Sequence, residues 1–133
     1  MNIETAIKKG VNILKENNIT NPYLDSEVLM TSTVKKDKKY IILNSKKTLT
    51  DKDLSYFNEL IKRRTKGEPI AYLINKKEFW NTEFYINNDV LIPRPDTELI
   101  IEQVLKIYSK NSYCRTLDIG LGSGCILLSI LKE

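Results

Sequence analysis

The sequence contains no histidine, and cysteine, glycine and proline are scarce. Its 133 residues include two Cys, five Gly and four Pro. Without histidine, the chain has no Ser-His type of triad, no histidine general base and no supply of the commonest zinc ligand. Cys114 and Cys125 are too few for a disulfide framework or a cysteine metal site. We therefore expect no metal cofactor, and any chemistry must use other groups.

Long apolar runs are also missing. No stretch of about 18 apolar residues occurs, so the sequence predicts no membrane-spanning helix. The first residues, "MNIETAIKKG", lack the apolar core of a signal peptide, so we expect a cytoplasmic location. The composition, 41% hydrophobic and 29% charged, is typical of a soluble globular protein with one domain or two small ones.

The net charge is +4 and the isoelectric point is near 9.0. This mild excess favours approach to RNA or to an acidic protein. The local runs "KKDKK" at residues 35–39 and "KRR" at residues 62–64 are interpreted as solvated faces, the usual place of such runs.

The first half of the chain predicts helices. Asn2 is placed to cap a helix whose apolar residues recur at helical spacing (Ile3, Ala6, Ile7, Val11 and Leu14). Pro22 favours the first position of a second helix, with Leu24, Val28 and Leu29 expected on its buried side. "KKYIILNS" predicts a brief helix, and Thr50 with Asp53 resembles a capping box that begins another.

The pattern changes after Pro69. Residues 70–92 are rich in aromatic and β-branched residues and predict extended structure, with a hairpin that turns near Asn81 and Thr82. A helix capped by Asp96 should follow. "CRTLDIG" then predicts a short buried strand, and "CILLSILKE" a helix that follows it. The expected fold class is α+β overall.

The loop between that strand and helix carries the candidate binding residues. It reads Asp118-Ile119-Gly120-Leu121-Gly122-Ser123-Gly124. Glycines allow a sharp turn and close approach of a ligand to the backbone.

The spacing of the glycines separates the possible cofactor motifs. The dinucleotide spacing G-x-G-x-x-G fails because Cys125 stands at its last position, and no Gly-Lys-Ser/Thr follows as in a P-loop. The G-x-G-x-G spacing, with an acid two residues earlier, resembles motif I of S-adenosylmethionine-dependent methyltransferases. A tight turn without a ligand is the structural alternative. Cys125 is interpreted as a small packing residue.

A second stretch makes the resemblance specific. "VLIPRPDTELI" at residues 90–100 resembles the signature of the methyltransferases that modify a glutamine of peptide chain release factors, the HemK/PrmC-type family. "RRTKGEPIAYLINKKEFW" and "YLDSEVLM" are similar to other parts of that family, with Asp25 as the matching acid in the latter. The resemblance covers nearly the whole chain.

The resemblance implies a layout and a function. It implies a helical substrate-recognition domain at residues 1–67, a β-hairpin linker at 68–91 and the start of a Rossmann-like methyltransferase domain at 92–133. The partner implied is the release factor, whose glutamine side chain is N(5)-methylated. The implied S-adenosylmethionine contacts, by position in the two motifs, are Asp118, Gly120, Leu121, Gly122, Ser123, Gly124, Arg94 and Thr97.

The family's catalytic Asn-Pro-Pro-Tyr motif does not occur in the sequence. We therefore assign no catalytic residue to this chain and expect a truncated copy or a fragment of a longer enzyme. Such a chain should bind S-adenosylmethionine weakly or not at all and transfer no methyl group. Two other interpretations stay open: a methyltransferase for nucleic-acid amino groups, and a helical binding module without enzymatic activity.

Overall fold

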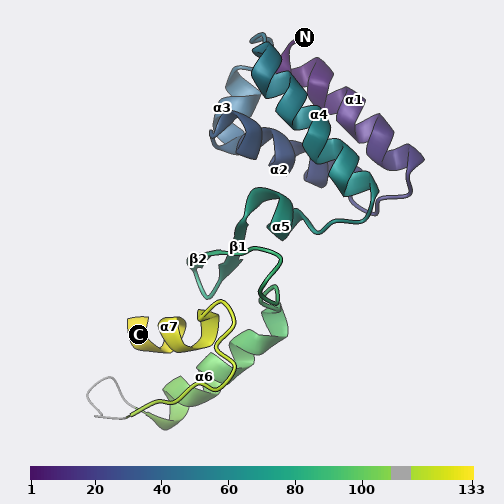
Figure 1. Cartoon of the computed structure of the whole chain (residues 1–133). Helices are drawn as coiled ribbons and strands as arrows, with labels where there is room; N and C mark the ends of the chain where they lie inside the picture. Colours follow the sequence, from purple (N-terminus) through teal and green to yellow (C-terminus); the bar gives the residue numbers. More distant parts are fainter. Residues whose placement is uncertain (109–114) are drawn as a thin grey trace. The chain divides into compact units, whose positions relative to one another are not determined.

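The computed structural model describes residues 1–108 and 115–133, and the chain divides into two compact units, Met1–Ile74 and Asn75–Glu133 (Figure 1). The first unit consists of α1 (Ile3–Glu16), α2 (Pro22–Val34), α3 (Lys38–Leu43), α4 (Asp51–Thr65) and α5 (Ile70–Ile74). The second contains β1 (Lys76–Phe79), β2 (Thr82–Tyr85), the 3-10 helix η1 (Pro95–Thr97), α6 (Glu98–Ile107) and α7 (Cys125–Lys132). The described chain is thus helix-rich with an antiparallel two-stranded hairpin, consistent with the predicted α+β class.

The first unit is built around a core to which all five helices contribute. Helices α1, α2 and α4 pack on one another, while α3 and α5 pack against α2. Burying an apolar side chain of this size stabilises a fold by about 1.5–3 kcal/mol, so this core is the main source of the unit's stability. Its buried members are Ile3, Ala6, Leu14, Leu29, Met30, Ile41, Leu49, Phe57, Leu60, Ile61 and Leu73.

The three long helices approach closely at Gly10 of α1. A Cβ atom there would lie 2.7 Å from Ser26 Oγ of α2, and 3.0 Å from both Phe57 Cζ and Ile61 Cδ1 of α4. Each of these distances is shorter than a normal van der Waals contact. Because glycine has no side chain, α1 can lie in the groove between α2 and α4.

The beginning of α1 is fastened to the loop after α3. Asn2 Oδ1 accepts from the N–H of Thr5 at 2.8 Å, which confirms the predicted cap. The N–H groups of the two preceding residues, Ile3 and Glu4, donate to the carbonyls of Lys47 and Ser45 respectively. The first turn of the helix therefore finds acceptors that an isolated helix would lack.

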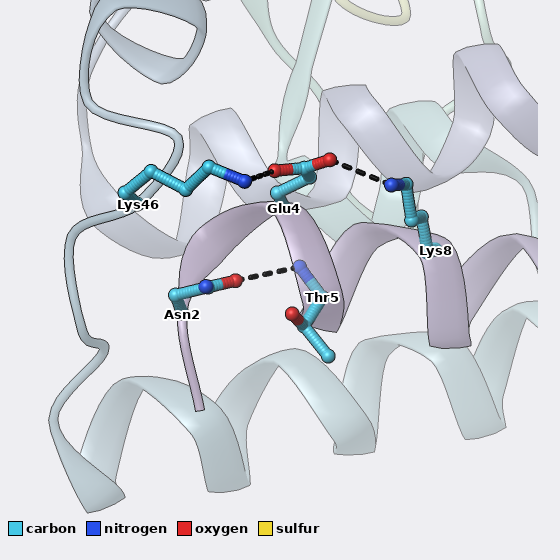
Figure 2. Close-up of polar contacts among 5 residues, drawn as sticks. All are labelled: Asn2, Glu4, Thr5, Lys8 and Lys46. Carbon is cyan, nitrogen blue, oxygen red and sulfur yellow. Dashed lines mark hydrogen bonds and ion pairs between the residues drawn. The ribbon is translucent and has the colours of Figure 1, made fainter.

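Glu4 adds two ion pairs at the same place (Figure 2). Its carboxylate lies 2.5 Å from Lys46 Nζ of the loop and 2.6 Å from Lys8 Nζ one helical turn later. The hydrogen bond from Lys46 and then that from Lys8 lower the pKa of Glu4 from 4.5 to about 2. Both lysines are exposed, so water and salt screen these pairs.

A buried ion pair joins α2 to α4. Arg64 Nε donates to Asp25 Oδ2 at 2.7 Å, and the two side chains are only 20% and 10% exposed. Arg64 Nη1 also donates to the carbonyl of Glu68 at 3.0 Å. Next to it, Arg63 makes a two-pronged contact with the Glu68 carboxylate, which lowers the pKa of Glu68. Two arginines thereby fix both the end of α4 and the turn toward α5.

The buried side of α2 differs from the prediction. Leu29 is buried as expected, but Leu24 is 57% exposed. Three polar residues take the buried side instead, and each has a partner. Asp25 pairs with Arg64, Ser26 Oγ donates to the Ile7 carbonyl, and Thr33 Oγ1 donates to the Leu29 carbonyl. Apolar spacing misses such a face because partners elsewhere in the fold satisfy its polar groups.

Residues 70–74 were predicted to be extended, which was wrong. They form α5, whose Leu73 is buried in the core of the first unit. Five residues carry too little periodicity to separate a short helix from a strand, and here packing against α2 and α4 decides the outcome.

The hairpin of the second unit confirms the prediction, with the turn one residue earlier. Lys76 pairs with Tyr85 and Phe79 with Thr82, so the loop residues are Trp80 and Asn81. Both have positive φ, 48° and 52°, the geometry of a type I′ turn. Tryptophan rarely adopts it, and here the Trp80 N–H donates to Glu98 Oε1 at 2.9 Å. The hairpin turn is thereby tied to the first residue of α6.

The predicted strand at residues 114–120 is not formed. Cys114 lies outside the described residues; Arg115 to Asp118 are irregular, and Leu117 and Ile119 are 83% and 88% exposed. A strand needs a neighbour for its N–H and C=O groups, and in the described parts of the chain no segment pairs with these residues. The helix expected after the loop is confirmed as α7.

Asp25 of α2 should contribute more to the stability of the first unit than the exposed Asp51 of α4. Asp25→Asn leaves the partly buried Arg64 without a carboxylate and should lower the free energy of unfolding of the first unit by roughly 3 kcal/mol. Asp51→Asn, at an exposed aspartate of α4, should cost less than about 1 kcal/mol. Native-state hydrogen exchange of the α2 and α4 amides measures both. Equal losses in the two variants would contradict the assignment.

Glu4 should contribute stability only above acid pH. Because its pKa is lower in the folded chain, its contribution is complete above the ordinary value of 4.5 and is lost as the pH falls through about 2. The urea midpoint of Glu4→Gln should therefore lie slightly below that of the wild type at neutral pH and approach it in acid. Glu16→Gln, at an exposed acid of α1 without an ion pair in the described structure, should show no such convergence.

Candidate functional site

The glycine loop runs from Asp118 to the first turn of α7 and has the backbone form that its sequence predicts. Gly120, Gly122 and Gly124 have φ values of +84°, +57° and +76°, a region that side chains disfavour. The Gly124 N–H donates to the Leu121 carbonyl at 2.8 Å, which closes a tight turn, and the Gly124 carbonyl accepts from Leu128 at 2.9 Å. The loop thus turns the chain directly into a helix.

The surroundings of these glycines differ. A Cβ at Gly120 would have no atom within 4 Å, whereas one at Gly124 would lie 3.2 Å from Leu128 Cδ1. Gly120 therefore borders open space, and Gly124 packs against its own helix. The helix N-cap is a glycine, so no side chain caps the first turn of α7. Such a helix end can donate N–H groups to a negatively charged ligand.

The charged side chains predicted for the site, those of Asp118 and Arg94, have no hydrogen-bond or ion-pair partner in the described structure. Asp118 is half-buried and Arg94 is exposed, and neither side chain makes a hydrogen bond or ion pair with a described residue. Thr97 is half-buried, and its backbone N–H donates to the Arg94 carbonyl at 3.0 Å. Asp96 does not cap α6 as predicted, because residues 95–97 form η1 and place Thr97 at the cap position. Among the described residues, no hydrogen bond or ion pair joins Arg94 or Thr97 to the glycine loop.

Cys125 is buried at the foot of α7, as expected for a packing residue. One turn further along, Ser129 Oγ is buried with no hydrogen-bond partner among the described residues. A shallow pocket of about 220 Å³ lies elsewhere in this unit, and none of the predicted site residues lines it. Its lining residues are Val104, Tyr108, Arg115, Thr116, Leu117 and Ile130.

Glu98 is the residue that sequence reasoning undervalued. The sequence alone assigns it no role in the fold or the site, yet its carboxylate accepts from the backbone N–H of Trp80 in the hairpin turn. The far end of α7 reaches the same turn, since Lys132 Nζ donates to Thr82 Oγ1 at 2.7 Å. The position of Glu98 in the "PRPDTE" motif was the available signal, but its partner lies 18 residues earlier and no spacing rule identifies it.

The described residues contain no group of three His, Cys, Asp or Glu side chains placed to hold a metal ion. Among the described helices, none has the length and apolarity needed to cross a membrane.

Comparison with known proteins shows the family. The family model "PrmC N-terminal domain" matches residues 5–74, which covers most of the first unit. The chain belongs to the PrmC N-terminal domain family. This confirms the resemblance that the sequence motifs indicated.

Curated relatives of this PrmC-type chain extend the similarity across its whole length. A release factor glutamine methyltransferase of Buchnera aphidicola subsp. Acyrthosiphon pisum is 43% identical over 130 residues, which cover 98% of this chain and 46% of the relative. One of Clostridium acetobutylicum is 38% identical over 132 residues, covering 99% and 46%. A bifunctional methyltransferase of Rickettsia bellii is 32% identical over 157 residues, covering 98% and 28%. The chain spans about half the length of the release factor glutamine methyltransferases it matches.

The loop glycines should differ in what they tolerate. Gly120→Ala places a side chain in open space, so its cost is backbone strain alone, about 1–2 kcal/mol. Gly124→Ala adds a close contact with Leu128 and should also loosen α7. Hydrogen exchange of the α7 amides measures the difference. Faster exchange in Gly120→Ala than in Gly124→Ala would contradict this view of the loop.

Proposed function

We propose that this chain supplies the substrate-recognition and cofactor-loop parts of an S-adenosylmethionine-dependent enzyme that methylates the glutamine side chain of peptide chain release factors. The observation that carries the proposal is the family match of the helical unit, together with similarity to release factor glutamine methyltransferases over at least 98% of the chain.

In this proposal the chain has three parts. Residues 1–67 recognise the release factor, residues 68–91 form the linker, and residues 92–133 begin a Rossmann-like methyltransferase domain. Residues 115–119 become its first strand when further strands lie beside them, because only paired strands satisfy their backbone groups. The exposure of Leu117 and Ile119 supports this, since both are apolar side chains that a sheet would cover.

The glycine loop holds the methionine part of S-adenosylmethionine. Gly120 and Gly122 let the ligand approach the backbone, and Leu121, Ser123 and Gly124 complete the turn. The carboxylate of Asp118 accepts from the ammonium group of the ligand. Its lack of a partner in the described structure supports this role, because the carboxylate is free to bind a cation.

Arg94 and Thr97 form the neighbouring wall of the cofactor site. Pro93 and Pro95 limit the backbone on both sides of Arg94, so its guanidinium is presented to a carboxylate at little cost in entropy. S-adenosylmethionine offers such a carboxylate. When bound, it supplies the electrophilic methyl group that the glutamine nitrogen accepts.

Residues 1–133 alone should bind S-adenosylmethionine weakly, because no described strand pairs with residues 115–119 to hold the glycine loop in a sheet. They should transfer no methyl group, because the sequence contains no Asn-Pro-Pro-Tyr motif to orient the glutamine amide. Calorimetric titration with S-adenosylmethionine and a labelled-methyl assay on release factor test this. Micromolar cofactor binding or methyl transfer by the chain alone would refute it.

A chimera tests the function itself. Residues 1–133 would replace the matching part of the Clostridium acetobutylicum relative, which supplies the remaining half of the enzyme. The chimera should methylate release factor glutamine, and Gly122→Val should raise its KM for S-adenosylmethionine roughly tenfold or more by blocking approach to the backbone.

The unchanged relative is the positive control, and circular dichroism checks that the chimera folds. A folded chimera that methylates transfer RNA or DNA in preference to release factor would overturn the assignment in favour of a nucleic-acid methyltransferase. A folded chimera that methylates none of these would leave the helical unit as a binding module only.

A further inference from the structure

The segment of residues 35–47, here called the lysine segment, concentrates the positive charge of the chain. It contains six lysines and one aspartate, a net charge of +5, whereas the whole chain carries +4. Everything outside the segment therefore totals −1. All six lysines are exposed (Lys35, Lys36, Lys38, Lys39, Lys46 and Lys47).

Helix α3 lies within this segment and exposes apolar side chains next to the charges. Ile42 and Leu43 are 62% and 73% exposed. At about 100° per residue, these two and the lysines one turn earlier, Lys38 and Lys39, share an arc of roughly 140°. Ile41, only 5% exposed, points away from that arc into the core. Lys38 Nζ donates to the Glu27 carboxylate of α2 at 2.8 Å, whereas Lys39 has no ion pair in the described structure. The outer face of α3 thus places the unpaired charge of Lys39 beside two exposed apolar side chains.

The surface is held in place by contacts on its inner side. Asp37 caps α3 by accepting from the Tyr40 N–H at 2.8 Å. Lys47 Nζ donates to the Tyr40 hydroxyl at 2.9 Å, and Lys36 Nζ lies 5.8 Å from the centre of the same ring. The loop that follows is bound to the first turn of α1 through the carbonyls of Ser45 and Lys47. A surface ordered in this way loses little conformational freedom when it binds.

We propose that this face of α3 is the docking surface for an acidic segment of a protein partner whose carboxylates alternate with apolar side chains. Lys35 and Lys39, whose side chains have no partner in the described structure, meet the carboxylates, and Ile42 and Leu43 meet the apolar side chains. The inference rests on the proposed function in naming the release factor as the partner.

The observations favour protein over nucleic acid. A phosphate backbone offers nothing to the exposed carbon of Ile42 and Leu43. Proteins that bind single-stranded nucleic acid also present aromatic side chains on which the bases stack. The ring in this segment, that of Tyr40, is half-buried and already engaged with Lys36 and Lys47.

Binding of release factor to residues 1–133, measured by calorimetry, is the first arm of the test. Lys39→Glu and Leu43→Ser should each weaken binding roughly five- to tenfold, because each removes one half of the match. The matched controls are Lys9→Glu on α1 and Leu24→Ser on α2, which make the same changes at exposed positions outside the segment. They should change affinity by less than about twofold. Circular dichroism of all four variants should match the wild type, because the side chains of Lys39 and Leu43 make no hydrogen bond in the described structure.

Two further probes separate the possible failures. A synthetic acidic peptide that alternates Glu and Leu tests the surface without release factor, and a short duplex RNA tests the other polyanion class. If release factor fails to bind but the peptide binds and both segment variants weaken it, the surface stands and the proposed partner falls. If the peptide binds wild type and segment variants alike, or not at all, the surface is overturned. Tighter binding of RNA than of peptide, lost in Lys39→Glu and kept in Leu43→Ser, overturns the choice of protein.

Discussion

The packing of the first unit depends on the hydrogen bonds of the Arg64 guanidinium. One guanidinium near the end of α4 pairs with a nearly buried carboxylate on α2 and also donates to the carbonyl of Glu68. A charge removed from water in this way is tolerated only when its donors are satisfied, so the helix crossing and the following turn are specified together. The apolar core would permit several ways of sliding α2 along α4. The Asp25–Arg64 pair favours the one in which these two side chains meet, and Gly10 then lets α1 occupy the groove that this crossing leaves.

Local features of the fold could be predicted from the sequence because their causes lie within a few residues. Asn2 caps α1, Pro22 begins α2 and the Thr50 hydroxyl accepts from the Asp53 N–H, each through contacts at short sequence separation. Errors arose where the cause is distant. The buried side of α2 depends on a partner 39 residues away, and α5 is helical because of the core it joins. Residues 115–119 are the clearest case, since a strand is defined by its neighbour and apolar composition alone cannot supply one.

The candidate site shows the same division. The glycine spacing predicted a loop of left-handed backbone ahead of a helix, and the three positive φ values follow from that requirement. Which polar groups face the ligand could not be derived in this way. Asp118 and Arg94 belong to separate stretches of sequence, and their joint assignment to one cofactor comes from the family resemblance. The family model matches residues 5–74, which contain neither of them. A motif also does not reveal the role of each of its residues. Glu98 directly follows the expected site residue Thr97, yet its carboxylate accepts from the backbone N–H of the hairpin turn.

The hairpin turn contains an intrinsic fluorescence probe, the indole ring of Trp80. Trp80 is the single tryptophan of the sequence and belongs entirely to the second unit. Its indole N–H donates to Glu133 Oε1 at 3.1 Å, and its backbone N–H is bound to Glu98. Its emission spectrum therefore responds to loosening of α6 or α7 against the hairpin, while the first unit contributes only tyrosine emission. Selective excitation of tryptophan can follow the melting of the glycine-loop unit on its own, even in a mixture where the helical unit remains folded.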